Sequence, residues 1–248
     1  MLNYLSASTG TVLMKFLLAP SLIVLLTACA SPEKKGYTLP ENLVDIPTPR
    51  PIACRFEKVS ANHPQSSNWY FWRDAQRTET RDEASNQGEI WERNNAGQFF
   101  YTRLFYNEHT ALDFVPGDLA ATEVAPSWNQ LSSLIDPKML GKELPLIGKE
   151  QIGKNAVEYY GGTLNKVATE IDWLPSLQLP ARMVKNLPEG LITLTLIDCS
   201  GELNSSVKPI TKQELDNLRH LDYTDLGDME DDPMVRHLEQ LMGEHHKH

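Results

Sequence analysis

The sequence predicts a mostly β protein of the α+β class: a curved antiparallel sheet, or half-barrel, with a helix packed across it and two C-terminal helices. Two observations predict this class. Ten of the chain's twenty aromatic residues lie between residues 69 and 106, and short turns containing Gly and Asn interrupt that stretch. Aromatic strand formers between such turns are typical of hairpins, and therefore of antiparallel strands.

Turn signals divide the chain into its expected strands: "SNQG" at 85–88, "NNAG" at 94–97, "PGD" at 116–118 and "PEG" at 188–190. In "IDWLPSLQLPARM" apolar and polar residues alternate, which indicates one buried and one wet face. The two prolines of this segment favour an edge or a bend. The expected strands are 51–59, 69–82, 88–93, 98–106, 110–115, 155–163, 166–174, 178–185 and 190–199.

Three segments carry helix signals. Ser127 can cap a helix that ends at Pro137, and Thr211 with Glu214 matches the capping box. Asp232-Pro233 begins the last helix, because proline at the first helical position loses no hydrogen bond. The apolar positions are Trp128, Leu131, Leu134 and Ile135 in the first helix, Leu215, Leu218 and Leu221 in the second, and Val235, Leu238, Leu241 and Met242 in the third.

The N-terminal segment has the layout of a secretory signal. Its apolar run, 16–28, is short for a membrane span and is broken by Pro20, while Lys15 precedes it and small residues end it. The motif "LTAC" at 26–29 resembles the lipobox of bacterial lipoproteins. Met14 is the expected true start. The alternatives are an ordinary cleaved signal and an apolar core helix.

The lipobox resemblance implies a lipid anchor at Cys29. In that family the signal is cut before the Cys, which receives a diacylglyceryl thioether and an N-acyl chain, with palmitate among the acyl groups. Several acyl chains anchor a protein stably. The residue that follows the anchor is Ala30 and not an Asp. This implies passage through the lipoprotein-processing and sorting machinery to the periplasmic face of the outer membrane.

Composition suggests four segments. These are a signal peptide (1–28), an anchor with a Pro-rich flexible tether (29–51), the half-barrel domain with one helix (52–203) and a helical, acidic, His-bearing tail (204–248). The net charge of −10 argues against a nucleic-acid partner, because phosphate contacts need clustered basic residues.

The chain has three cysteines. Lipidation of Cys29 leaves Cys54 and Cys199, which we expect to form a disulfide in an oxidising compartment. Because both lie in expected strands, this bond would hold the first and last strands of the domain close together. The alternative is a pair of separate buried thiols.

A late strand suggests a fold family. Trp173, then Leu179-Pro180 and Arg182, then "LITLTLID" follow one another in the order seen in the LolA/LolB-type lipoprotein-carrier superfamily. Residues 166–199 resemble its closing strands. The resemblance implies a half-barrel with helices plugging its mouth. An anchored chain with this fold would be a receptor or acceptor rather than a soluble shuttle.

The aromatic surplus predicts a ligand site. More apolar surface is present than one helix can cover, so we expect an apolar cavity of several hundred Å³ between sheet and helix, able to bury an acyl chain or a lipoprotein's acyl group. The same residues could instead form an ordinary core. The candidate lining residues are Trp69, Phe71, Trp91, Phe100, Tyr101 and Trp173.

Clusters of histidine and of charged residues suggest possible metal and anion sites. His237, His245, His246 and His248 could bind Zn²⁺ or Cu²⁺, or could simply be solvated. The acidic tail lacks the EF-hand order of Ca²⁺ ligands, which favours helix-stabilising charges instead. Five arginines between residues 73 and 103 could form an anion site, but six acids in the same stretch favour a cross-strand charge ladder.

No catalytic motif appears in the chain: it has neither HExxH nor Gly-x-Ser-x-Gly. We therefore expect a non-enzymatic protein without a cofactor beyond the acyl groups on Cys29. Three functions compete: an envelope protein that binds an apolar ligand or assists envelope assembly, a metal-handling lipoprotein that uses the C-terminal histidines, and a purely structural envelope lipoprotein.

Overall fold

The computed structural model describes residues 38–40, 43, 51–61, 63–121, 126–201, 207–229 and 231–245. The signal segment, Cys29 and most of the expected tether lie outside the described residues, as do His246 and His248. From Gly36 onward the chain forms one compact unit.

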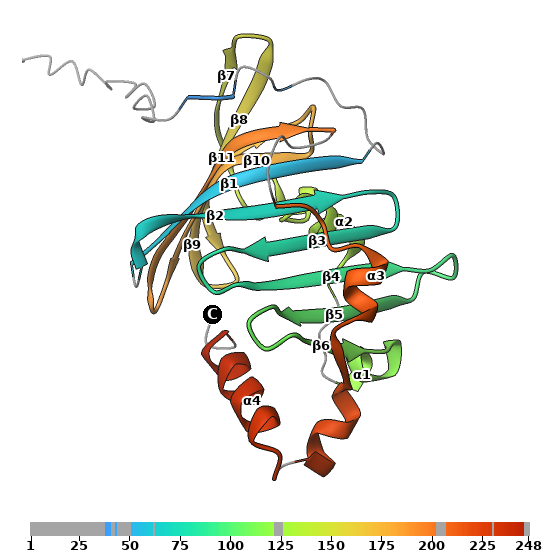
Figure 1. Cartoon of the computed structure of the whole chain (residues 1–248). Helices are drawn as coiled ribbons and strands as arrows, with labels where there is room; N and C mark the ends of the chain where they lie inside the picture. The colour runs from blue at the N-terminus through green and yellow to red at the C-terminus, as the bar shows by residue number, and fades with distance from the viewer. Residues whose placement is uncertain are drawn as a thin grey trace, which may run out of the picture. The chain divides into compact units, whose positions relative to one another are not determined.

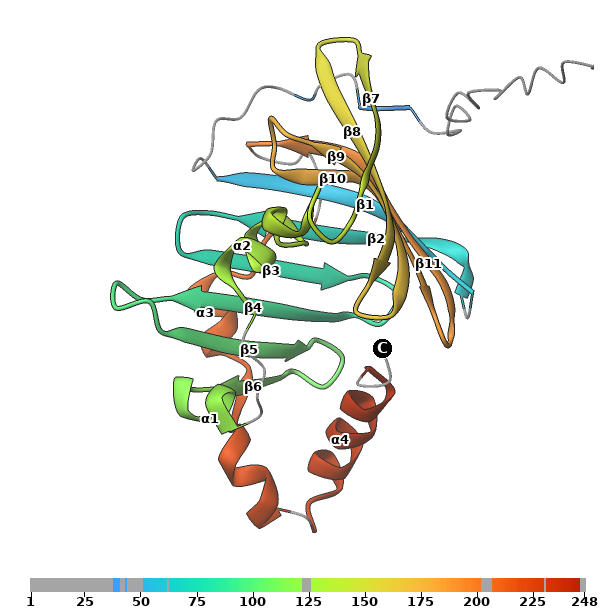
Figure 2. The same ribbon diagram turned by 180° about the vertical axis from the view of Figure 1, so that it is seen from behind.

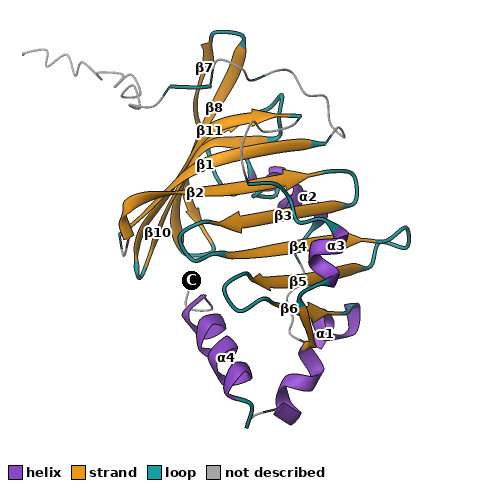
Figure 3. Ribbon diagram, in the orientation of Figure 1, coloured by secondary structure: helices purple, strands orange, loops and turns teal. Residues whose placement is uncertain are grey.

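The unit is built on one sheet of twelve strands in the order β12-β6-β5-β4-β3-β2-β1-β11-β10-β9-β8-β7 (Figures 1 and 3). Every neighbouring pair is antiparallel except β12 and β6, which are parallel. The strands are β1 (Ile52–Ser60), β2 (His63–Arg73), β3 (Arg77–Asp82), β4 (Gln87–Arg93), β5 (Phe99–Phe105), β6 (Thr110–Phe114), β7 (Leu146–Ile152), β8 (Asn155–Leu164), β9 (Val167–Leu174), β10 (Leu179–Leu187), β11 (Gly190–Ser200) and β12 (Arg219–Asp222).

Helices are few and short. They are α1 (Pro116–Ala121), α2 (Trp128–Ser133), the 3₁₀ turns η1 (Pro137–Met139) and η2 (Tyr223–Met229), α3 (Lys212–Asp216) and α4 (Pro233–His245). The mostly β class and the open sheet agree with the prediction. None of the described helices has both the length and the apolar character needed to cross a membrane.

Several boundaries differ from the prediction. The single strand expected at 69–82 is two strands, because Asp74 makes a turn: its Oδ1 accepts hydrogen bonds from the backbone N–H groups of Gln76 (2.8 Å) and Arg77 (2.7 Å). The strands β7 and β12 and the helix α1 were not expected. Strand β7 is exposed along most of its length, so it lacks the alternation that marks a half-buried strand.

The capping signals were correct. Ser127 caps α2, and Thr211 and Glu214 form the complete capping box of α3. Helix α2 ends early because Leu134 has a positive φ of 63°. Helix α3 also stops early, and Leu221, expected on its apolar face, lies in β12.

The disulfide between Cys54 and Cys199 is present. The two residues are direct partners in the β1–β11 pair, with Cα atoms 4.0 Å apart. Both are fully buried in a core cluster with Phe56, Phe71 and Leu196. The bond therefore fixes the centre of the sheet, where the first and the eleventh strands meet.

The two faces of strands β2–β5 are covered by different segments. Helix α2 covers one face, in front of the sheet in Figure 2, and we call this the cavity face; it carries the cross-strand row Phe71–Thr80–Glu89–Arg103. The strap, residues 207–218 including α3, covers the other face, in front of the sheet in Figure 1. This strap face carries Trp72, Glu79 and Ile90.

Helix α4 packs on the sheet near its β6 edge. Val235 and Leu238 are fully buried and Met242 is nearly so, in a cluster with Phe105 and Leu112. The helix begins at Pro233, as predicted, and its apolar face is the expected one. The segment expected to be a separate helical tail thus contributes a strand and a helix to the sheet's packing.

Candidate functional site

A partly open cavity of about 330 Å³ lies between helix α2 and strands β2–β5. Its volume is at the small end of the ~300–1,000 Å³ typical of ligand sites. The position agrees with the prediction of a cavity between sheet and helix. The lining does not, because the prediction was an apolar cavity and polar side chains make up much of this one.

The apolar part of the lining lies nearest α2. Leu131 and Leu134 belong to the helix segment, Trp91 lies on β4, and Trp69 lies on β2 opposite Asp82. Trp91 stacks on Tyr101 of the next strand, with ring centroids 4.3 Å apart. The Trp91 ring that borders the cavity is thus held in place by its packing against Tyr101.

The polar part lies toward the β3–β4 turn. Lys58 and Asp82 form a hydrogen-bonded ion pair there. The Nη2 atom of Arg103 donates a hydrogen bond to Oε1 of Gln87 at 3.0 Å. The Oγ atom of Ser85 is buried and has no hydrogen-bond partner in the part of the chain that the structure describes.

Arg103 is the buried charge of the cavity. It is 7% exposed, and among the described residues no carboxylate oxygen lies within 4.0 Å of its guanidinium. Glu89 is its cross-strand partner, but this side chain is exposed. Glu89 accepts a hydrogen bond from Tyr101, whose pKa is raised well above its usual value by burial and by the Glu89 charge.

Arg73 holds helix α2, which covers the cavity, in place. Its Nη1 donates to the carbonyl oxygen of Ser132 at the end of α2 (2.6 Å), and its Nη2 donates to that of Leu177 in the β9–β10 turn (3.0 Å). It is 7% exposed, and burial lowers its pKa to about 10. A cation near the C-terminal end of a helix also complements the helix dipole, although α2 is short.

The six predicted lining residues lie in different places. Trp69 and Trp91 border the cavity, and Tyr101 lies behind Trp91. Phe71 is fully buried against the disulfide, and Trp173 is buried with Ile135 and Leu144 of the segment after α2. Both therefore fill core instead of bordering this cavity.

Phe100 lies on the opposite face of the sheet from Tyr101, because successive side chains of a strand alternate. It is 39% exposed and borders a wide surface depression of about 660 Å³ beside Arg77, Glu92 and Arg93. The prediction that Phe100 and Tyr101 line the same site was therefore wrong.

The five arginines do not form one anion site. Only Arg77 makes the expected cross-strand ion pair, at 3.8 Å from Glu92. Arg81 and Arg93 lie over the rings of Tyr106 and Trp128, at 4.1 and 4.3 Å from the ring centroids. Arg103 was considered only as one of these five arginines, for which a charge ladder was favoured over an anion site. Its signal was its position two residues from Tyr101 and from Phe105, which places all three on one face.

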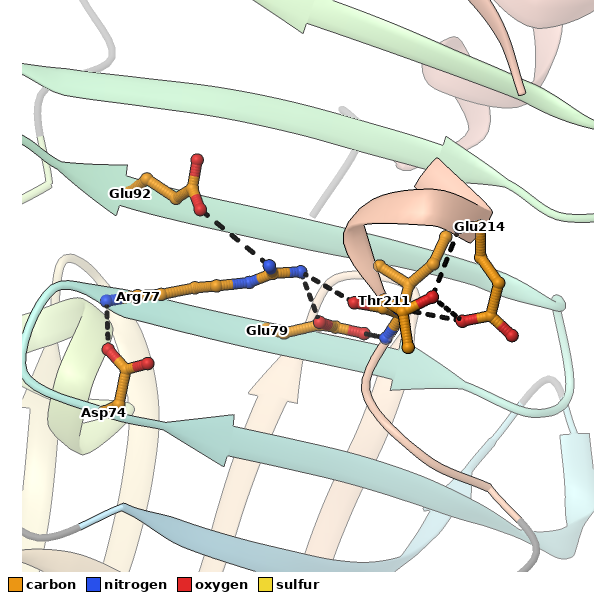
Figure 4. Close-up of polar contacts among 7 residues, drawn as sticks. Asp74, Arg77, Glu79, Glu92, Thr211 and Glu214 are labelled. Carbon is orange, nitrogen blue, oxygen red and sulfur yellow. Dashed lines mark hydrogen bonds and ion pairs between the residues drawn. The ribbon is translucent and has the colours of Figure 1, made fainter. Parts of the chain in front are cut away.

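A second polar cluster lies on the strap face (Figure 4). Glu79 is 1% exposed; its Oε1 accepts a hydrogen bond from the backbone N–H of Ile210 and its Oε2 accepts one from Arg77, both at 2.8 Å. Burial raises the pKa of Glu79 to about 7. The next strap residue, Thr211, starts the capping box with Glu214. This cluster fastens the strap to the sheet.

The predicted metal ligands are only partly described. His237 lies in α4 with its Nε2 at 3.3 Å from Oε1 of Glu108. His245 is the last residue of α4, and His246 and His248 fall outside the described residues. Within the described ranges, no group of three His, Cys, Asp or Glu side chains could hold a metal ion. The histidine hypothesis stays a prediction.

Comparisons with known proteins give remote similarities. No family model and no curated protein matches the chain. Among solved structures, PNGF-II is similar over 73% of this chain and 32% of its own (12% identity, TM-score 0.40). The MucA/MucB complex of Pseudomonas aeruginosa is similar over 66% of this chain and 54% of its own (13% identity, TM-score 0.35).

A domain assigned as an outer membrane lipoprotein-sorting protein, from Vibrio parahaemolyticus, is similar over 64% of this chain and 87% of its own (7% identity, TM-score 0.32). The chain thus spans about a third of PNGF-II and about half of the MucA/MucB match. All three TM-scores lie below 0.5, so the similarities are too remote to assign a shared function.

Proposed function

We propose that this protein is a lipid-anchored envelope protein that binds an acyl-chain ligand, without catalysis, in the cavity beneath α2. The observation that carries the proposal is the cavity itself, with Trp69, Trp91, Leu131 and Leu134 on its walls. Burial of an acyl chain against such walls contributes about 0.8 kcal/mol per CH₂ group.

The surrounding face is otherwise well filled. On one side of the cavity lies the core around the disulfide, and on the other lies the cluster beneath α4. Protein interiors are close-packed, so space left between two packed clusters is typical of a place that something else occupies. The Arg73 hydrogen bonds hold α2 above this space without filling it.

Ligand binding in the cavity can be tested by a substitution that fills the cavity. Leu131→Arg places a long charged side chain at the wall and should weaken binding of a dansyl-labelled fatty acid by at least about tenfold, measured by fluorescence titration. Asn129→Arg, at an exposed position on the same helix, is the matched control and should bind as the wild type does. Equal affinity of all three proteins, each with an unchanged melting temperature, would contradict the proposal.

The anchor is tested separately, because it rests on the "LTAC" motif at 26–29. The mature protein, extracted from membranes, should begin at Cys29 and carry the mass of its acyl groups, whereas Cys29→Ser should stay as an unlipidated precursor. Intact-mass spectrometry distinguishes the two. A mature chain without acyl mass would refute the anchor and the outer-membrane location, while leaving the cavity proposal intact.

A further inference from the structure

The strand register determines how polar and apolar side chains are distributed along the cavity. Next to α2 the paired residues Thr78, Trp91 and Tyr101 form one row across β3, β4 and β5. Four residues away along β3 and β4, Asp82 and Gln87 form a row beside the β3–β4 turn. Arg103 lies between these rows and reaches toward the second, where it donates to Gln87. Trp91 lies in the row next to α2 and Trp69 lies opposite Asp82 in the second row, so a ligand lying along the cavity would contact both indole rings and pass Arg103 between them.

Arg103 is an unusual buried cation. Burying a charge is unfavourable unless an opposite charge or several hydrogen bonds compensate it. Among the described residues its side chain donates one hydrogen bond, to a neutral amide, and its Cζ lies 5.3 Å from the centroid of the Phe105 ring, whereas a guanidinium has five N–H donors. Arg103 therefore has donor capacity left at the wall of an open cavity.

The nearby acids do not supply the missing charge. Asp82 is engaged by Lys58 in an ion pair. Glu89 lies across from Arg103 and also lines the cavity, but it is exposed, accepts a hydrogen bond from Tyr101 and lies beyond 4.0 Å from the guanidinium. The Ser85 hydroxyl adds a buried donor to the same cavity lining, with no partner among the described residues.

We propose that the ligand of this cavity is an anionic amphiphile whose carboxylate or phosphate pairs with Arg103 while its acyl chain lies against Trp69 and Trp91. The planar guanidinium fork matches carboxylate and phosphate oxygens in a bidentate arrangement. Ser85 donates a further hydrogen bond to the same group. This inference rests on the proposed function, since it specifies the head group of the ligand that the cavity binds.

The experiment compares a dansyl-labelled fatty acid with its methyl ester, which keeps the chain and removes the charge. Wild-type protein should bind the acid about tenfold or more tightly than the ester. Arg103→Met should lower the affinity for the acid to that for the ester and leave ester binding unchanged. Arg103→Lys should keep part of the preference. Arg81→Met, the same change on the strap face, is the control and should behave as wild type.

Each outcome decides one point. Displacement of the probe by lysophosphatidic acid more readily than by unlabelled fatty acid identifies a phosphate, and the reverse order identifies a carboxylate. Equal binding of acid and ester by wild type, or an acid preference that survives Arg103→Met, overturns the anionic head group and leaves the proposed function standing. Binding of neither probe overturns both.

Discussion

Two buried charges on opposite faces of the same sheet have opposite surroundings. Glu79 on β3 has a partner for each oxygen, Ile210 N–H and the Arg77 guanidinium, and the strap covers it. Arg103 on β5 is nearly as buried, but it donates to a neutral amide and borders a cavity. A buried charge with a complete set of partners is structural, whereas one with spare donors beside open space can bind a ligand.

Arg73 sharpens this comparison because it shares the face and the 7% exposure of Arg103. Neither has a carboxylate within 4.0 Å among the described residues, so the absence of an acid alone does not indicate a ligand site. Arg73 instead donates to the carbonyls of Ser132 and Leu177, and it is not among the residues that line the cavity. The number of unfilled donors and the adjoining space distinguish the two arginines.

The largest expected effect is on stability. Glu79→Ala leaves the Ile210 N–H and the Arg77 guanidinium without their acceptor, and should lower the free energy of unfolding by about 2–4 kcal/mol. Arg73→Met should cost about 2–3 kcal/mol, since two backbone carbonyls lose their donor. Arg103→Met should change it by less than about 1 kcal/mol, because removal of a charge with few partners is close to neutral.

Urea unfolding of the oxidised proteins measures these differences. The disulfide must stay intact in every variant so that the unfolded states remain comparable. A loss for Arg103→Met as large as that for Glu79→Ala would show that Arg103 is structural and would remove the distinction between the two faces.

A smaller effect is expected from pH. Burial raises the pKa of Glu79 in the folded protein to about 7, from its ordinary value of 4.5. Between these values the folded state binds more protons than the unfolded state, so stability should fall as the pH rises from about 4.5 to 7, by about 1–3 kcal/mol. In Glu79→Gln this contribution should be absent, so that the fall that remains near the upper end of this range is due to His220.

His220 contributes in the same direction and must be separated from Glu79. The hydrogen bond that the His220 Nδ1–H donates to the Asp113 carboxylate raises the His220 pKa, so its stabilising contribution is complete below its unfolded pKa and is lost as the pH rises through the folded one. The profile of His220→Gln should therefore still fall across the Glu79 window. Unfolding midpoints measured at several pH values test this, and identical profiles for wild type and Glu79→Gln would exclude the assignment.

Local features were predictable from the sequence. The turn signals at 85–88 and 94–97 lie between β3, β4 and β5 as expected, and the caps at Ser127, Thr211 and Pro233 begin the expected helices. The cysteine pair placed β1 beside β11. Each of these depends on a residue's immediate neighbours or on covalent chemistry, which the sequence displays directly.

Strand β12 was missed because its pairing is not local. The residues Arg219–Asp222 have no alternation of their own; they become a strand by pairing with the edge strand β6 in parallel, more than a hundred residues away. The distribution of the aromatic residues was missed for a similar reason. Alternation separates Phe100 from Tyr101, but only packing decides that Trp69 and Trp91 border a cavity while Phe71 and Trp173 are core.

The sequence by itself determined a hairpin-rich sheet, its capped helices and its cysteine pair, because these follow from backbone preferences and from cysteine count. Only the tertiary structure decided which buried charges have partners. The partners of Glu79 and Arg73 lie 131, 59 and 104 residues away in the chain, at Ile210, Ser132 and Leu177. A charge is compensated by whatever the fold brings within about 4 Å, and that distance is set by the packing of remote segments.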